Sequence, residues 1–223
     1  MFSRRREVAV GLGVYAVYLA VRQLKLRRGA QAAAERNAER VVALEERLGI
    51  HLEPALQRAL LPRRRLVAGL NVAYVTLNVG LTVGWLMTLF RRRDPSFHRL
   101  RRAAVLAMLG AQPVFLLFPL APPRKLDGFV DTIESVSGVS LDRGLVAELY
   151  DPIAAMPSIH VAFAVVTAAG LRSGARSPWT RGLAPGYPPA VALVVVATAN
   201  HYVLDAVAGW ALARLALRLA GRT

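Results

Sequence analysis

The sequence has no cysteine and very little lysine. The absence of cysteine excludes a disulfide framework, a thiolate zinc site, an iron–sulfur cluster and a cysteine nucleophile. Lysine occurs twice and arginine 27 times, an imbalance that points to a GC-rich, bacterial genome. The 223 residues suit one domain or one bundle, because a second core would be hard to fit.

Charge and apolar residues occupy separate parts of the chain. The mean hydropathy is +0.38 although the formal net charge is +15. Arginines cluster at the edges of apolar blocks, at residues 4–6, 63–65, 91–93 and 101–102. Arginines are typical of the flanks of membrane spans, because cytoplasmic loops are rich in them and because they attract anionic lipid headgroups. Zinc-finger spacing and an aromatic-interleaved basic surface are both missing, so we expect no nucleic-acid partner.

Six apolar blocks predict an all-α membrane protein with a bundle of six transmembrane helices. The first block follows three arginines and has no small-x-small cleavage site, which favours an uncleaved signal-anchor helix over a secretory signal. The second block carries no charge and is long enough to span a bilayer without interruption. The sequence assigns no oligomeric state. The six blocks are residues 8–21, 66–90, 103–120, 157–171, 190–199 and 203–220.

Residues 28–65 have a mixed, amphipathic pattern that ends near Gly49 and again near Pro62. The pattern predicts one or two helices, which either lie at the membrane interface or connect spans in water. We therefore divide the chain into residues 1–65, a signal anchor with amphipathic helices, and residues 66–223, a catalytic bundle. His51 and His98 fall in charged segments and are expected to be surface histidines.

Loop charge predicts the orientation in the membrane. If every block crosses, the N-terminal arginines, residues 91–102, residues 172–181 and the C-terminal arginines share one side, which should be cytoplasmic. We expect the plasma membrane, with the opposite loops extracytoplasmic. One of these loops, residues 121–156, is long enough to suggest a functional role. It holds six acids, Asp127, Asp131, Glu134, Asp142, Glu148 and Asp151.

Two histidines start apolar blocks on that extracytoplasmic face. Pro157 suits the first position of a helix and so puts His160 in the first turn of the fourth block. His201 precedes the sixth block, with Asp205 one helical turn later. Because two crossings separate the histidines, they emerge on the same face. Arg124, at the end of the third block, can join them there.

This set of residues suits phosphoryl transfer through a histidine. Asp205 can fix the tautomer of His201 and leave its other ring nitrogen as a nucleophile, while His160 acts as general acid. Arg124 offers a guanidinium to phosphate oxygens, and the helix N-termini add N–H donors. This chemistry needs no metal or cofactor. The alternative is that both histidines and Asp205 are metal ligands of a hydrolase.

Other polar residues have a functional and a structural interpretation. Ser158 either contacts phosphate or caps its helix. Four side chains inside spans either line a pocket or form hydrogen bonds between helices. These four are Asn71, Tyr74, Asn78 and Gln112.

Two motifs resemble the type 2 phosphatidic acid phosphatase superfamily. Residues 156–160 resemble its Pro-Ser-x-His motif, and residues 201–205 resemble its His-x-x-x-Asp motif. The sequence around Arg124 and the Asn200, His201, Tyr202 run are similar to the inositol phosphorylceramide synthase branch. The resemblance covers about residues 66–210. It implies a phosphohistidine on His201, with Asp205 as its partner, His160 as acid, and Ser158 and Arg124 holding phosphate.

The chain departs from the phosphatase branch in two motifs. Val195 stands where that branch has an arginine, and residues 121–124, Ala-Pro-Pro-Arg, replace its Lys-x6-Arg-Pro motif. Fewer cations favour transfer of a headgroup, such as phosphoinositol, from a lipid donor to a hydroxyl acceptor. Asn200, Tyr202, Asp127 and Asp131 are candidate substrate contacts. The alternatives are a phosphatase of lipid or polyprenyl phosphates and a non-catalytic lipid-binding or transport protein.

Overall fold

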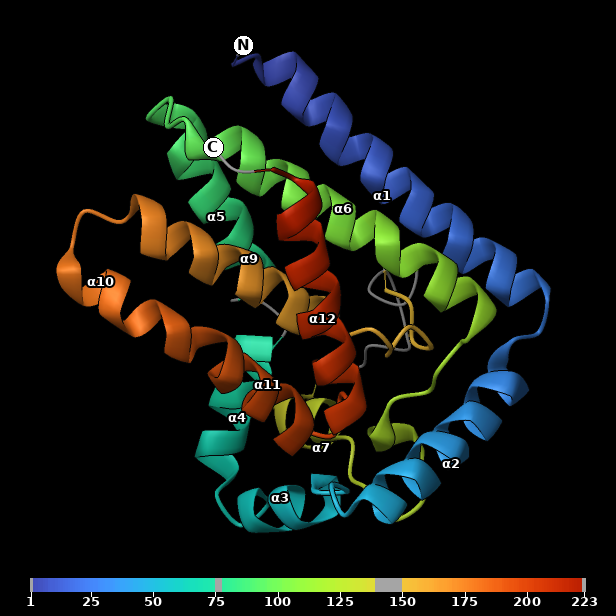
Figure 1. The fold of residues 1–223 in the computed structure, drawn as a ribbon. Helices are drawn as coiled ribbons and strands as arrows, with labels where there is room; N and C mark the ends of the chain where they lie inside the picture. The colour runs from blue at the N-terminus through green and yellow to red at the C-terminus, as the bar shows by residue number, and fades with distance from the viewer. Residues whose placement is uncertain (1, 75–77, 139–149, 222–223) are drawn as a thin grey trace.

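The structure, a computed structural model, describes residues 2–74, 78–138 and 150–221. Within these ranges every regular element is a helix, and one isolated β-bridge joins Leu120 to Ala154 (Figure 1). An all-α architecture is therefore confirmed. The longer helices are α1 (Arg4–Arg27), α2 (Gln31–Leu48), α5 (Asn78–Arg91), α6 (Ser96–Leu117), α9 (Ile159–Gly174), α11 (Tyr187–Ala197) and α12 (Val203–Leu219). The shorter ones are α3 (Glu53–Leu60), α4 (Arg64–Val72), η2 (Pro123–Lys125), α7 (Thr132–Ser137), α10 (Pro178–Leu183) and η3 (Ala184–Gly186).

Helices α6, α9 and α12 pack against one another and form the centre of the bundle. Small residues line their contacts, which lets the backbones approach closely. The tightest approach is at Gly209 of α12, where an added Cβ would lie 2.2 Å from the carbonyl oxygen of Ser158. This contact fixes the start of α9 against the first turns of α12. The core around it includes Ala103, Ala107, Ala162, Val166, Ala213 and Ala216.

Helix α1 lies along α6, and most of its apolar side chains remain exposed (Figure 1). Val8 and Leu12, for example, are 60% and 65% exposed. A helix whose apolar face has no protein partner is suited to lipid contact. Near its N-terminus, Glu7 pairs with Arg101 at 3.4 Å. Near the other end of α1, Arg22 and Lys25 are buried.

Both chain ends lie at the same end of the bundle as the α5–α6 turn (Figure 1). Phe2 packs on Phe97 with ring centroids 5.6 Å apart, and the Arg99 side chain donates to the Gly221 carbonyl. The arginine clusters at residues 4–6 and 91–102 therefore lie together. This grouping fits the predicted cytoplasmic side, while α2 and α3 lie at the opposite end.

Within the described residues the second apolar block contains α4 and α5, and residues 75–77 between them lie outside the described part. That this block forms one membrane span therefore stays a prediction. Helix α4 packs on α7, whereas α5 packs on α9, so the two parts of the block contact different helices. Asn71, Tyr74 and Gly69 lie in the α4 half.

Two of the described helices, α1 and α6, are long and apolar enough to cross a membrane. Helices α5 and α9 are apolar but shorter. The 16 residues of α9 rise about 24 Å, less than the roughly 30 Å hydrocarbon thickness of a bilayer. The count of six spans therefore stays a prediction.

Candidate active site

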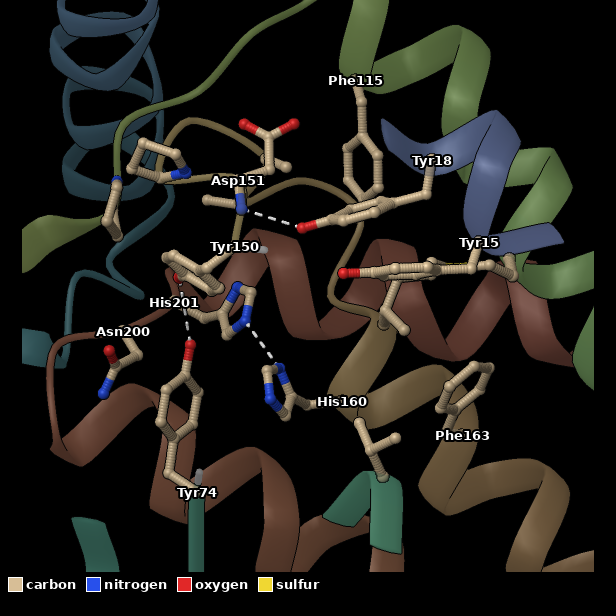
Figure 2. Close-up of a pocket in the computed structure, with 17 residues that line it drawn as sticks. Tyr15, Tyr18, Tyr74, Phe115, Tyr150, Asp151, His160, Phe163, Asn200 and His201 are labelled. Carbon is tan, nitrogen blue, oxygen red and sulfur yellow. Dashed lines mark hydrogen bonds between the residues drawn. The ribbon is translucent and has the colours of Figure 1, made fainter. Parts of the chain in front are cut away.

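His160 and His201 lie side by side at the wall of a pocket (Figure 2). Nε2 of His201 is 3.3 Å from Nδ1 of His160. On its other side, Nδ1 of His201 is 3.2 Å from Oδ2 of Asp205, which also accepts the Tyr202 N–H at 2.9 Å. The backbone contact orients the carboxylate, and the carboxylate orients the imidazole. The structure thus brings together the three residues that the motifs single out.

Local backbone features place the two histidines. Ser158 is the N-cap of α9, where its Oγ accepts the Val161 N–H at 3.4 Å. Pro157 therefore lies before the cap and not at the first helical position, which corrects our expectation, although His160 is still in the first turn. At the other histidine, Ala199 adopts a φ of 56°, and the His201 N–H donates to the Val195 carbonyl at 3.0 Å. This tight turn fixes His201 just ahead of α12.

The charge state of His201 suits a nucleophile. Its ring is almost entirely buried, with a residue exposure of 4%. Burial, together with a smaller effect of the positive charge of Arg124, lowers the pKa of His201 to about 3. The imidazole is therefore neutral at pH 7. If Nδ1–H donates to Asp205, the lone pair of Nε2 points toward His160 and the pocket.

The pocket has a volume of about 440 Å³, and its walls are mainly aromatic and apolar (Figure 2). Tyr74 stacks on the His160 ring, with centroids 4.4 Å apart, and its hydroxyl lies 3.4 Å from that of Tyr150. Phe115 and Phe163 line another part of the wall. A cavity of this size and composition is suited to an amphiphilic ligand.

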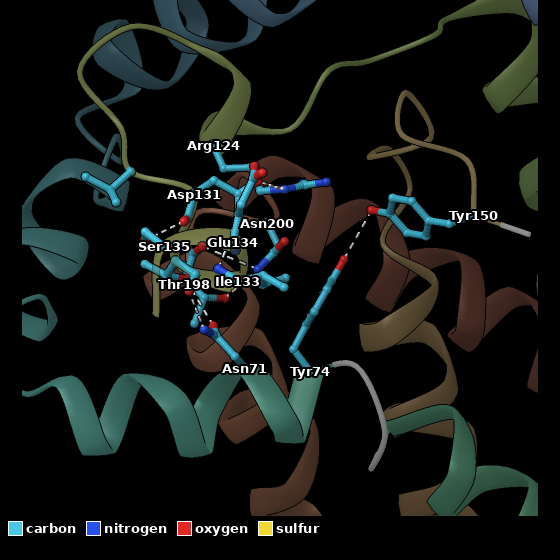
Figure 3. A network of polar contacts seen from close by, with 12 residues as sticks. Asn71, Tyr74, Arg124, Asp131, Ile133, Glu134, Ser135, Tyr150, Thr198 and Asn200 are labelled. Carbon is cyan, nitrogen blue, oxygen red and sulfur yellow. Dashed lines mark hydrogen bonds and ion pairs between the residues drawn. The ribbon is translucent and has the colours of Figure 1, made fainter. Parts of the chain in front are cut away.

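Arg124 lies close to this site and is held in place by Asp131 (Figure 3). Its Nε donates to Asp131 Oδ2 at 3.0 Å, and its backbone N–H donates to the Ala199 carbonyl at 2.8 Å. Oδ1 of Asp131 accepts the Ile133 and Glu134 N–H groups and so caps α7. Asp131 therefore orients Arg124, and neither of the two residues lines the pocket.

Among the predicted substrate contacts, Tyr74 and Asn200 do line the pocket. Tyr202 does not, because its hydroxyl donates to the buried Ala121 carbonyl at 3.1 Å. Asn71 also lies elsewhere, where it donates to the Thr132 carbonyl at 2.7 Å and joins α4 to α7. Of the two interpretations of Asn71, the structure supports a hydrogen bond between helices and not a place in the pocket wall.

Two further candidates lie away from the pocket. Gln112 donates to the Met108 carbonyl within its own helix at 2.9 Å. Asp127 is exposed on the surface. The side chain of Asn78 lies outside the described residues, as do Asp142 and Glu148 of the acidic loop.

The N-terminus of α12 does not offer its first N–H groups to a phosphate, which corrects another expectation. Val203 N–H donates to Glu53 Oε1 and Leu204 N–H donates to Glu45 Oε1, both at 2.7 Å. Three successive N–H groups, starting with that of Tyr202, are thus satisfied by carboxylates. Through these two glutamates, the segment of residues 28–65 contacts the helix that carries Asp205.

Sequence reasoning missed the contribution of α1. Tyr15 and Tyr18 line the pocket, and the Tyr18 hydroxyl accepts the Asp151 N–H at 2.8 Å. Lys25 forms a buried ion pair with Asp151 at 2.7 Å, and Arg22 donates to the Tyr150 carbonyl at 2.9 Å. Polar residues spaced at 18, 22 and 25 in an apolar helix were the available signal.

A family model described as the PAP2 superfamily matches residues 39–219, which is more than half of the chain. The chain belongs to the PAP2 superfamily. Membership in the PAP2 superfamily suggests phosphatase or phosphotransferase activity on lipid-like phosphates in a membrane protein. No curated protein and no solved structure matches the chain. The match does not distinguish branches, so the inositol phosphorylceramide synthase-like branch stays a prediction.

Proposed function

We propose that this PAP2 superfamily protein is a membrane phosphotransferase that moves a phosphoryl-containing headgroup from a lipid donor to a hydroxyl acceptor through His201. The observation that carries the proposal is the chain of contacts from Asp205 through His201 to His160 at the wall of an aromatic pocket. An orienting carboxylate, a neutral imidazole and a second histidine are the parts that nucleophilic catalysis with acid–base assistance requires.

In the first step, Nε2 of His201 attacks phosphorus, a nitrogen–phosphorus bond forms, and the bond from phosphorus to the lipid oxygen breaks. His160, which takes up a proton when the anionic donor phosphate binds beside it, gives that proton to the lipid oxygen. In the second step the acceptor oxygen bonds to phosphorus and the nitrogen–phosphorus bond breaks, while His160 removes the proton of the acceptor hydroxyl. Asp205 holds the Nδ1–H of His201 throughout and stabilises the positive charge that develops on the ring.

The 3.3 Å contact between the two rings has a consequence for the first step. A phosphorus atom with its oxygens does not fit between nitrogens at this separation. The donor must therefore displace the His160 ring from Nε2 and take its place. His160 lines the pocket beside Tyr74, so the displaced ring remains next to the leaving oxygen.

The apolar wall supports a lipid donor, whose chains can lie against Phe115, Phe163 and Tyr15. Arg124, next to His201 and aligned by Asp131, supports binding of the phosphate oxygens. The arginine-rich end of the bundle lies away from α2 and α3, which supports a plasma-membrane location with the pocket extracytoplasmic and anionic lipids at the basic flanks.

The test is to trap the covalent intermediate. The purified protein in detergent is mixed with headgroup-labelled phospholipids and lipid phosphates, quenched in alkali and measured by intact-protein mass spectrometry. We expect an alkali-stable, acid-labile adduct on wild type and on His98→Ala, a histidine control away from the pocket, and none on His201→Ala. His160→Ala should slow breakdown of the adduct and raise its level.

The fate of the adduct then separates transfer from hydrolysis. Chasing with a polyol such as inositol should release the label as a new phosphodiester faster than water releases it. A label that leaves at the same rate with and without the acceptor would identify a phosphatase. If His201→Ala retains the wild-type lipid-dependent function, the protein is a lipid-binding or transport protein and the proposal fails.

A further inference from the structure

A second cluster of ionisable side chains, with one histidine and two glutamates, lies at the N-terminus of α12, outside the pocket. It consists of Glu45 in the last turn of α2, His51 in the connection that follows, and Glu53, the first residue of α3. Gly49 adopts a left-handed φ of 69° and ends α2, so the chain changes direction before α3 begins. The turn brings the three side chains together within nine residues of sequence.

The three side chains converge through one atom each. Nδ1 of His51 is 3.0 Å from Oε2 of Glu53 and 3.5 Å from Oε2 of Glu45, and all three atoms lie within 4.8 Å of one another. In the part of the chain that the structure describes, none of these three atoms has a hydrogen-bond partner. The contacts therefore lack the alignment of an N–H···O bond.

Burial makes this arrangement costly for the protein alone. Both glutamates are 0% exposed, and their other oxygens are already occupied by N–H groups of α12. Two adjacent buried carboxylates repel each other and lose hydration, so a proton or a cation shared between them stabilises the pair. A single imidazole supplies at most one positive charge.

We propose that Glu45, His51 and Glu53 bind a divalent transition-metal cation, with Zn²⁺ as the best fit. One imidazole and two carboxylates are ligands that Zn²⁺ accepts, whereas Ca²⁺ and Mg²⁺ favour oxygen alone. Metal–ligand bonds of about 2.0–2.2 Å in a tetrahedron put ligand atoms roughly 3.3–3.6 Å apart. The separation of 3.5 Å between His51 and Glu45 is of this size, and that of 3.0 Å between His51 and Glu53 is slightly shorter. The His51 side chain is 16% exposed, which leaves an approach for the ion and a water ligand.

The ion has a positioning role, not a catalytic one, because it lies outside the pocket wall. Each glutamate binds the ion with one oxygen and an N–H group of α12 with the other. The ion therefore ties α2 and α3 to the helix that begins two residues after His201. This inference does not depend on the proposed reaction, since metal binding can be measured in a His201→Ala protein.

The test measures metal content and affinity on the full-length protein in detergent. The protein is stripped with a strong chelator, titrated with Zn²⁺ and then with Mn²⁺, and analysed by inductively coupled plasma mass spectrometry. We expect about one Zn²⁺ per chain, bound more tightly than Mn²⁺. His51→Ala and Glu45→Gln should weaken binding by at least about tenfold, the lower limit seen for loss of even an outer-sphere partner.

Matched controls are Glu46→Gln, an exposed neighbour of Glu45, and His98→Ala, a histidine elsewhere. Both should retain wild-type affinity. Glu45→Gln keeps an oxygen for the Leu204 N–H, so it should fold, and Zn²⁺ should raise the unfolding midpoint of wild type but not of this variant. If wild type binds no more Zn²⁺ or Mn²⁺ than Glu45→Gln and gains no thermal stability, the proposal is wrong.

Discussion

Two clusters that contain histidine flank the N-terminus of α12. One is the pocket cluster of His160, His201 and Asp205, and the other is the cluster of Glu45, His51 and Glu53. His201 has a single carboxylate partner and turns its other nitrogen toward a pocket. His51 faces two buried carboxylates away from that pocket. The comparison shows that two histidines beside one helix end can have different surroundings, which differ in the number of carboxylates and in access to a cavity.

The largest expected effect separates the two clusters by function. His201→Ala should reduce turnover by at least about 10⁴-fold, because the covalent step is lost. Metal content should not change. The measurement is turnover of labelled donor together with metal analysis on the same preparation. A variant that keeps a tenth of wild-type turnover would show that another residue is the nucleophile.

Gly209→Ala should disrupt the arrangement of His160, His201 and Asp205, because it moves the helices that position them. The new Cβ would lie 2.2 Å from the Ser158 carbonyl oxygen, so α9 and α12 must separate near both catalytic histidines. We expect a loss of about 3 kcal/mol in the free energy of unfolding, with lower turnover. Gly80→Ala, where nothing lies within 4 Å of the new Cβ, is the control. Equal unfolding midpoints for the two variants would contradict the close contact.

Lys25→Met tests the pocket wall and not the histidines. It leaves the Asp151 carboxylate buried without its ion-pair partner, which costs about 3 kcal/mol. The KM for the lipid donor should rise, since residues 150–155 line the pocket. Lys25→Met/Asp151→Asn should recover part of the lost stability. If the double variant is no more stable than the single one, the ion pair does not hold this segment.

The stability should also depend on pH. The pKa of His201 falls from 6.5 to about 3 on burial, so below pH 6.5 the unfolded chain binds a proton that the folded chain does not. This contribution to stability is complete above pH 6.5 and is lost as the pH falls toward 3. Thermal midpoints measured across this range should fall less steeply for His201→Gln. Parallel curves would indicate a different protonation state.

The sequence predicted the pocket cluster because its residues lie in short motifs at helix starts. His160, His201 and Asp205 need only the correct faces of α9 and α12 to meet. The Glu45, His51 and Glu53 cluster depends on how α2 and α3 dock on a helix about 150 residues away, which no local pattern records. For the same reason His51 was expected to be a surface histidine, and Tyr202 was expected in the pocket although its ring turns into the core.

The placement of α1 decides how much of the pocket lies within the part of the chain that matches the PAP2 superfamily. That part starts at residue 39, after the helix that supplies Tyr15 and Tyr18. His160 and His201 lie inside the matched range, whereas one portion of the wall around them comes from the helix that precedes it. A fragment trimmed to residues 39–219 would therefore have a pocket open on one side.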